Sequence, residues 1–288
     1  MKRAPSGVLL ALVSAAGYGL LPVLFAFATR TGFERHSLLA QRFLLAGLLL
    51  LVGLALRGGG QRLPARRLAA CLALGFCGYA SQAWLYFTAV DLSGAGLATV
   101  LLYLYPGFVT LLEWAVHGER PGAGRLAALG LALCGSVLTC ALGPVRPNAW
   151  GVAASIGGAL LYAVYLMVSG VVLRGVRALA AGAWVCLGTG VAFAALALFG
   201  GRVDLADTPR RAGFVLALAV FCTLVPIVAL FAAIARLGVA RVAVLSTVEP
   251  VVTLGLAAAI LGETFSGAQL AGALLVVSSV LLIQREPA

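Results

Sequence analysis

The residue with the clearest chemical potential is Glu249, which lies near the centre of the apolar stretch 240–261. A carboxylate at that depth in a membrane is costly unless it is paired, hydrated or protonated, so it should face the interior of a helix bundle. Pro250 follows it, removes one backbone N–H donor and frees carbonyl groups at the same depth. Three roles fit Glu249: a ligand for a substrate ammonium group, an acid that couples a proton, or a structural hydrogen bond to a neighbouring helix.

Aromatic and polar side chains form stripes on other apolar stretches. Two triplets share the spacing i, i+3, i+7, namely Tyr79, Gln82 and Tyr86, and Tyr162, Tyr165 and Ser169. This spacing places each triplet on one face of a helix. Such a face suits the wall of a cavity, where rings hold apolar groups or cations, and it suits interhelical packing equally well.

The chain repeats itself at an offset of 144 residues, which is half of its length of 288. Pro106 returns as Pro250, and Tyr18 returns as Tyr162. Prolines at equivalent places of two repeats indicate discontinuous or flexible helices beside a central site, although prolines are also common in membrane helices in general. We predict that Pro106 and Pro250 are hinges. Tyr103 lies three residues before Pro106, on the same face of its helix.

Depth, repetition and spacing together predict a substrate-binding site. Its expected members are Tyr18, Tyr79, Gln82, Tyr103 and Glu249. The six cysteines all lie in apolar stretches without a CxxC pair, and the two histidines lie near the ends of such stretches. We therefore predict no metal site and no disulfide. The missing HExxH, Walker and GxSxG motifs predict that the protein takes no cofactor and is not an enzyme.

The elements that hold these residues are long apolar runs. Hydrophobic residues make up 62% of the chain and charged residues 10%, against about 25% charged residues in soluble domains. Ten runs are separated by charged or Pro/Gly-rich breaks, at 6–29, 38–56, 68–89, 95–116, 124–142, 149–171, 179–199, 212–234, 240–261 and 267–283. Runs of about 20 residues can cross the hydrocarbon layer as helices. We predict an all-α membrane protein of ten transmembrane helices, in two five-helix repeats over residues 1–144 and 145–288.

The predicted topology follows from the number of spans and from charge. Five spans is an odd number, so the second repeat enters the membrane from the other side and the two repeats are inverted. Of the 20 Lys and Arg residues, 13 fall on the side that holds both termini, which predicts cytoplasmic termini by the positive-inside rule. The net charge of +11 belongs to loops that meet lipid headgroups of a cell inner membrane or plasma membrane. It does not indicate nucleic-acid binding.

Two segments at corresponding places carry a resemblance to a known family. They are Tyr103–Pro106 running to Gly118-Glu119, and Val248–Pro250 running to Gly262-Glu263, and Arg42–Gly47 at the start of the second run adds a third pattern. Together they resemble the EamA domain of the drug/metabolite transporter superfamily, in two tandem copies over nearly the whole chain. The second copy departs from the pattern where it has Cys186 in place of Arg42. The resemblance implies ten helices, cytoplasmic termini and export or exchange of small metabolites, often amino acids.

We predict a secondary transporter that exports a small organic metabolite such as an amino acid, by alternating access between the inverted repeats. Its partners would be the lipid bilayer and the substrate, with proton coupling as an option. The alternatives are a passive channel or facilitator, or a multidrug efflux carrier. A pore usually needs rings of carbonyls or charges along a path, and one acid at mid-depth provides little of this. A membrane-embedded lipid-modifying enzyme is disfavoured by the missing acid and histidine constellations.

Overall fold

The computed structural model describes residues 3–56, 63–118, 120–140, 148–261 and 266–285, and all the regular structure in these ranges is helical. The first half contains α1 (Arg3–Thr29), α2 (Arg35–Leu56), α3 (Ala65–Ala73), α4 (Ala80–Ser93), α5 (Ala95–Leu102), α6 (Tyr105–His117) and α7 (Ala123–Cys140). The second half contains α8 (Ala149–Val172), α9 (Ala178–Phe199), α10 (Pro209–Ala219), α11 (Val225–Leu237), α12 (Val239–Leu245), α13 (Glu249–Leu261) and α14 (Gly267–Arg285). Glu119, the pair Gly262-Glu263 and the predicted boundary after residue 144 lie outside the described residues.

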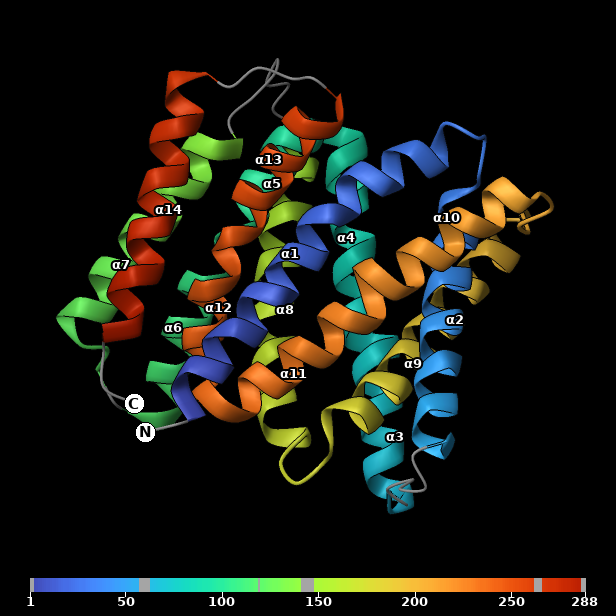
Figure 1. Cartoon of the computed structure of the whole chain (residues 1–288), viewed down its shortest axis with the longest axis horizontal. Helices are drawn as coiled ribbons and strands as arrows, with labels where there is room; N and C mark the ends of the chain where they lie inside the picture. Colours follow the sequence, from blue (N-terminus) through green and yellow to red (C-terminus); the bar gives the residue numbers. More distant parts are fainter. Residues whose placement is uncertain (1–2, 57–62, 119, 141–147, 262–265, 286–288) are drawn as a thin grey trace.

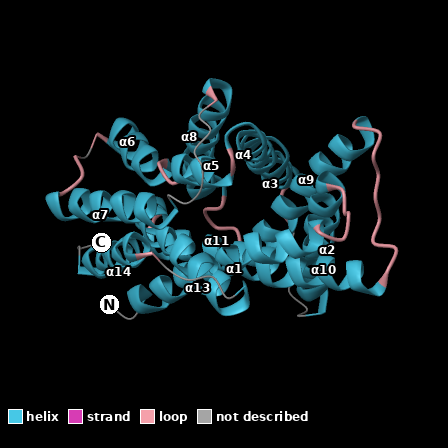
Figure 2. Cartoon of the chain, turned by 90° about the horizontal axis from the view of Figure 1, so that it is seen from above, coloured by secondary structure: helices cyan, strands magenta, loops and turns pink. Residues whose placement is uncertain are grey.

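Several of these helices join into continuous membrane-length segments. Three short turns join them: η1 (Leu74–Tyr79) and η2 (Val220–Leu224) are π-helical, and η3 (Ser246–Val248) is a 3-10 turn. Within the described ranges, eight segments are long and apolar enough to cross a membrane, whereas α7 and α14 are apolar but shorter. The structure thus confirms an all-helical membrane fold, and ten spans stay a prediction. The two shorter helices pack against each other at one edge of the bundle (Figure 1, Figure 2).

The two repeats run in opposite directions. The start of α1 and the end of α14 lie at one end of the bundle, which we call the terminal end (Figure 1). Arg236 at the end of α11 donates a hydrogen bond to the Ser6 carbonyl near the start of α1, so α11 also ends there. Arg174, just after α8, lines the same cavity as Arg236. The first helices of the two repeats, α1 and α8, are therefore antiparallel, as inverted repeats require.

The π-helical turns η1 and η2 occupy nearly equivalent places in the two repeats, and η1 sits at a close crossing with α9. Gly75 in η1 faces α9, where an added Cβ would overlap the carbonyl of Val185 and come within 2.9 Å of the Thr189 nitrogen. The Thr189 hydroxyl donates to the Gly75 carbonyl at 3.1 Å. Glycine thus lets the backbone of η1 touch the backbone of α9, as small residues commonly do between membrane helices.

At the end of the bundle opposite the terminal end, a polar network ties the α1–α2 turn to the α9–α10 loop. The Glu34 carboxylate accepts hydrogen bonds from the backbone N–H groups of His36 and Ser37 and so caps the start of α2. The Glu34 N–H donates to the Asp204 carboxylate at 2.9 Å, and Arg211 donates to the same carboxylate at 2.9 Å. This arrangement fixes the opposite end of the first repeat to the second.

Replacing Gly75 by Ala is expected to lower the free energy of unfolding by about 1–3 kcal/mol, because overpacking against backbone atoms cannot be relieved by a rotamer change. Gly53→Ala is the matched control, since an added Cβ at Gly53 in α2 meets no atom within 4 Å. The measurement is thermal unfolding of both variants in detergent micelles. Equal melting temperatures for the two variants would contradict the tight crossing.

The cap on α2 predicts a pH dependence of stability. Partial burial favours the neutral carboxyl of Glu34, but hydrogen bonds from His36 and Ser37 outweigh it and hold the pKa of Glu34 below its usual 4.5. A carboxyl group whose pKa is lower in the folded state than in the unfolded state stabilises the fold at pH values above its unfolded-state pKa. This stabilisation is lost as the pH falls through the folded-state pKa. The free energy of unfolding of the wild type should exceed that of the Glu34→Gln variant by about 1 kcal/mol at pH 7. This difference should shrink as the pH falls below 4.5. A constant difference down to pH 3 in unfolding titrations would contradict the cap.

Candidate functional site

A cavity of about 390 Å³ lies between helices of both repeats, and we call it the central cavity. All five residues predicted to bind substrate line it, from α1, η1, α4, the α5–α6 junction and α13: Tyr18, Tyr79, Gln82, Tyr103 and Glu249. The structure thus brings the predicted residues together, and their role in binding stays a prediction. Pro250 also lines the cavity, whereas Pro106 is buried in the first turn of α6.

The helices that carry Tyr103 and Glu249 are interrupted at equivalent places. In the first repeat α5 ends at Leu102 and α6 begins at Tyr105, and in the second repeat the 3-10 turn η3 separates α12 from α13. Each break comes just before a proline, which lacks a backbone donor and clashes with the preceding turn. Glu249 is consequently the first residue of a helix, where the positive end of the helix dipole favours a carboxylate.

Glu249 is partly exposed to the central cavity. Its carboxylate is a hydrogen-bond partner of the Tyr103 hydroxyl. The ion pairs among the described residues do not include Glu249. Because the carboxylate has a neutral hydrogen-bond donor and no cation, it retains the capacity to bind a cationic group or a proton.

A row of tyrosines in ring contact forms part of the cavity wall, which Tyr79, Tyr103, Tyr105 and Tyr162 line. Ring centroids lie 6.4 Å apart for Tyr103 and Tyr105, 4.8 Å for Tyr105 and Tyr162, and 5.8 Å for Tyr162 and Tyr165. Tyr79 continues the row at 5.7 Å from Tyr165. Ring faces of this kind hold apolar groups and cations. Tyr105 is the repeat counterpart of Glu249, and its hydroxyl donates to a backbone carbonyl of α12 at 3.3 Å.

Arg42 is a functional candidate that sequence reasoning missed. It lies in α2, lines the central cavity and is only 2% exposed. Among the described residues, its Nε and Nη1 atoms have no hydrogen-bond partner, and the side chain takes part in no ion pair. Its position inside the apolar run 38–56 was the available signal, since an ionisable residue there marks a functional site by default.

The contacts of Arg42 do not fully compensate its burial. The guanidinium carbon lies 4.4 Å from the centroid of the Phe43 ring, a cation–π contact worth about 0.5–2 kcal/mol. The Tyr79 hydroxyl is a hydrogen-bond partner of the guanidinium. An uncompensated buried charge costs several kcal/mol, so the free donors of Arg42 favour an anionic partner in the cavity.

A second cavity of about 540 Å³ lies at the terminal end. Glu113, His117, Arg174 and Arg236 contribute polar groups to its wall. The Glu113 carboxylate pairs with Arg125 of α7 and accepts a hydrogen bond from the first turn of α12 at 3.1 Å. This acid thus joins α6 of the first repeat to α12 of the second, beside the second cavity.

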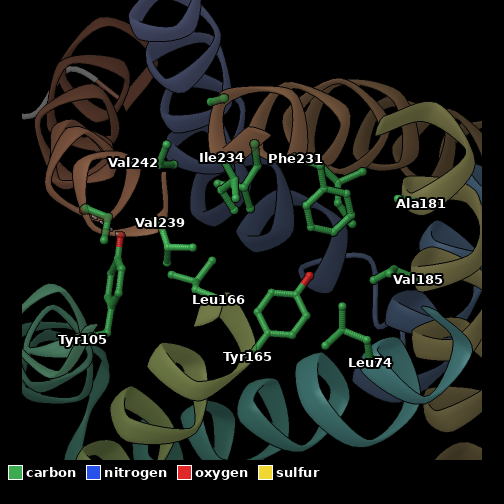
Figure 3. Packing of buried hydrophobic residues seen from close by; sticks show 14 of the residues in the cluster. Leu74, Tyr105, Tyr165, Leu166, Ala181, Val185, Phe231, Ile234, Val239 and Val242 are labelled. Atoms are coloured by element: carbon green, nitrogen blue, oxygen red, sulfur yellow. Dashed lines mark hydrogen bonds between the residues drawn. The ribbon is translucent and has the colours of Figure 1, made fainter. Parts of the chain in front are cut away.

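Buried apolar side chains of α8, α11 and α12 pack close together (Figure 3), and the most buried of them form a layer between residues that line the two cavities. Along α8, Tyr162 lines the central cavity and Ser169 lines the second, and Leu166 between them is 2% exposed. Val242 of α12 is 1% exposed and lies in the same layer as Ile234 of α11. The central cavity extends instead away from the terminal end, toward Thr99 of α5 and Leu254 of α13. The layer therefore closes the path to the terminal end.

The family is shown by two matches to one family model. The EamA-like transporter family matches residues 5–141 and again residues 149–285. The chain therefore belongs to this family, as two tandem repeats whose matches begin 144 residues apart. The family is one of transporters, and the described residues form an all-helical fold with eight candidate membrane spans.

Individual relatives agree with this assignment. The uncharacterised transporter sll1319 of Synechocystis sp. (strain ATCC 27184 / PCC 6803 / Kazusa) is 26% identical over 216 residues, which cover 73% of this chain. The match spans 65% of the length of that relative. One solved structure, whose title reads only "Crystal structure of protein", superposes on this chain with a TM-score of 0.83 and 21% sequence identity. The superposition covers 96% of this chain and 97% of the other. This last similarity shows the fold.

The buried layer predicts a difference in chemical accessibility along one helical segment. In a variant without its native cysteines, Leu254→Cys places a thiol in the central cavity. This thiol should react with a membrane-impermeant reagent that is added on the side of the membrane opposite the terminal end. Val242→Cys, in the layer, is the matched control on the same segment and should react much more slowly from either side. Equal labelling rates at the two positions would contradict a closed layer.

Proposed function

We propose that this transporter is a secondary carrier that exports a small organic metabolite, such as an amino acid, by alternating access. The observation that carries the proposal is the central cavity, which is closed toward the terminal end and exposes the Glu249 carboxylate at a helix break, where no ion pair of the described residues includes it. A metabolite with an ammonium group fits this carboxylate, and the tyrosine rings suit the remainder of such a molecule. Both termini lie in the cytoplasm of a cell inner membrane or plasma membrane in this proposal, as the distribution of Lys and Arg supports.

The proposed cycle uses the two helix breaks as hinges. The halves rock about Pro106 and Pro250, where fewer backbone hydrogen bonds resist bending. Opening toward the terminal end would separate α6 from α12, which the Tyr105 hydroxyl and the Glu113 carboxylate now join. A proton on Glu249 would replace the substrate ammonium during return, which would couple export to proton entry.

The buried layer between the cavities favours a carrier over a passive channel. A channel needs a continuous polar path in its open state, whereas Leu166 and Val242 are almost completely buried here. A multidrug carrier needs apolar and adaptable walls, and two isolated charges in one cavity favour a defined polar substrate instead.

Replacing Glu249 by Gln is expected to lower exchange by about tenfold or more, because a hydrogen bond to a charged group is worth about 1.5–3 kcal/mol. The variant should also lose the pH dependence of transport while folding and inserting normally. The measurement is counterflow in proteoliposomes of the metabolite that most raises the melting temperature in a library of amino acids, amines and carboxylates.

The control for this experiment is Asp207→Asn, which makes the same change at an exposed site in the α9–α10 loop. It should leave exchange unchanged. Unaltered exchange by the Glu249→Gln protein would remove this carboxylate from the mechanism. Uptake that does not saturate and shows no counterflow would indicate a channel.

A further inference from the structure

We propose that the Arg42 guanidinium is the carboxylate-binding group of the central cavity, so that the substrate carries a carboxylate. This inference rests on the proposed function, because it assigns a further part of the same transport site. Arg42 lines the cavity although it is only 2% exposed, so the ligand would meet it in a largely desolvated place. Its Nε and Nη1 atoms lack a hydrogen-bond partner within the part of the chain that the structure describes.

The surroundings of Arg42 hold the side chain and leave donors free. Phe43 lies against the guanidinium at 4.4 Å from ring centroid to the guanidinium carbon, and the Tyr79 hydroxyl is its hydrogen-bond partner. The Phe43 ring in turn packs against Phe193 of α9, with centroids 6.2 Å apart. A guanidinium held by packing is preorganised for an anion, since its planar donors match a carboxylate geometrically.

The charges of the cavity select a carboxylate over a dianion. Arg42 is the one basic residue among the described lining residues, and Glu249 is the one acid. Tyr79 lines the cavity together with both charged residues, and no ion pair of the described residues joins the two charges. A phosphate would carry about two negative charges beside a single cation and would be repelled by Glu249. A molecule with one carboxylate and one ammonium group satisfies both residues.

The anion site occurs once in a structure built from two repeats. The position equivalent to Arg42 is Cys186, which is buried in α9. If the two repeats had identical residues, their pseudo-two-fold symmetry would place the same side chains on both sides of the substrate. With a cation supplied by the first repeat and a carboxylate by the second, the cavity fixes the orientation of a substrate that has charges of opposite sign.

The test compares three probes that share a phenyl ring: L-phenylalanine, 2-phenylethylamine without the carboxylate, and 3-phenylpropanoate without the ammonium group. Dissociation constants are measured by calorimetry on the purified full-length protein, with inorganic phosphate as a fourth probe. Wild type should bind both carboxylates. Arg42→Gln should weaken their binding about 30-fold or more, which is typical when one partner of a buried charge pair is removed, and should leave the amine unchanged.

Two further variants make the result specific. Arg42→Lys keeps the charge without the planar donor pattern, so it should weaken carboxylate binding by a smaller factor, and it serves in place of Arg42→Gln if that variant does not fold. Arg30→Gln removes an exposed arginine after α1 and should bind all probes as wild type does.

Wild-type binding of no carboxylate, equal binding of 3-phenylpropanoate by wild type and Arg42→Gln, or phosphate binding as tight as carboxylate binding would each overturn the inference. Proteoliposome counterflow separates this failure from failure of the proposed function. Arg42-dependent binding without counterflow would reject the carrier and retain the anion site. Counterflow that Arg42→Gln leaves unchanged would reject the anion site and retain the carrier.

Discussion

A charge at mid-depth in a hydrocarbon layer is stable only where protein or water surrounds it, and this constraint organises the centre of the molecule. Arg42 and Glu249 come from different repeats, yet both line the same cavity. The two helix breaks beside them also free backbone groups, which are tolerated at membrane depth only inside a protein or a cavity. The cavity therefore exists where the chain has to place its polar groups.

The two repeats have similar backbone arrangements, and the residues that differ between them give the cavity its chemical groups. Each repeat has a π-helical turn in its third span and a break before a proline in its fourth. At the break, the first repeat begins its new helix with Tyr105 and the second with Glu249. Where the first repeat has Arg42, the second has Cys186. An antiparallel pair of similar units thus encloses an asymmetric binding site.

The closed end of the bundle depends on a small number of polar contacts around an apolar layer. The Tyr105 hydroxyl and the Glu113 carboxylate both bond to the backbone of α12, at its middle and its first turn. At the other end, Asp204 and Arg211 link the halves through the α1–α2 turn. Packed apolar layers are bistable rather than continuously deformable, so a change of access requires such contacts to break together.

The sequence determined the fold class, the duplication and most of the candidate site. Apolar runs, equivalent prolines and the i, i+3, i+7 stripes are local or periodic signals, and all five predicted binding residues that they led to lie in the wall of the cavity, as Pro250 does. Ten spans stay a prediction, because α7 and α14 are shorter than the eight membrane-length segments of the described residues. Only the tertiary structure showed that Arg42 faces the cavity without an acidic partner among the described residues, and that a buried layer closes one end. Pairing and burial arise from contacts between helices far apart in the chain, which periodicity along a single helix does not encode.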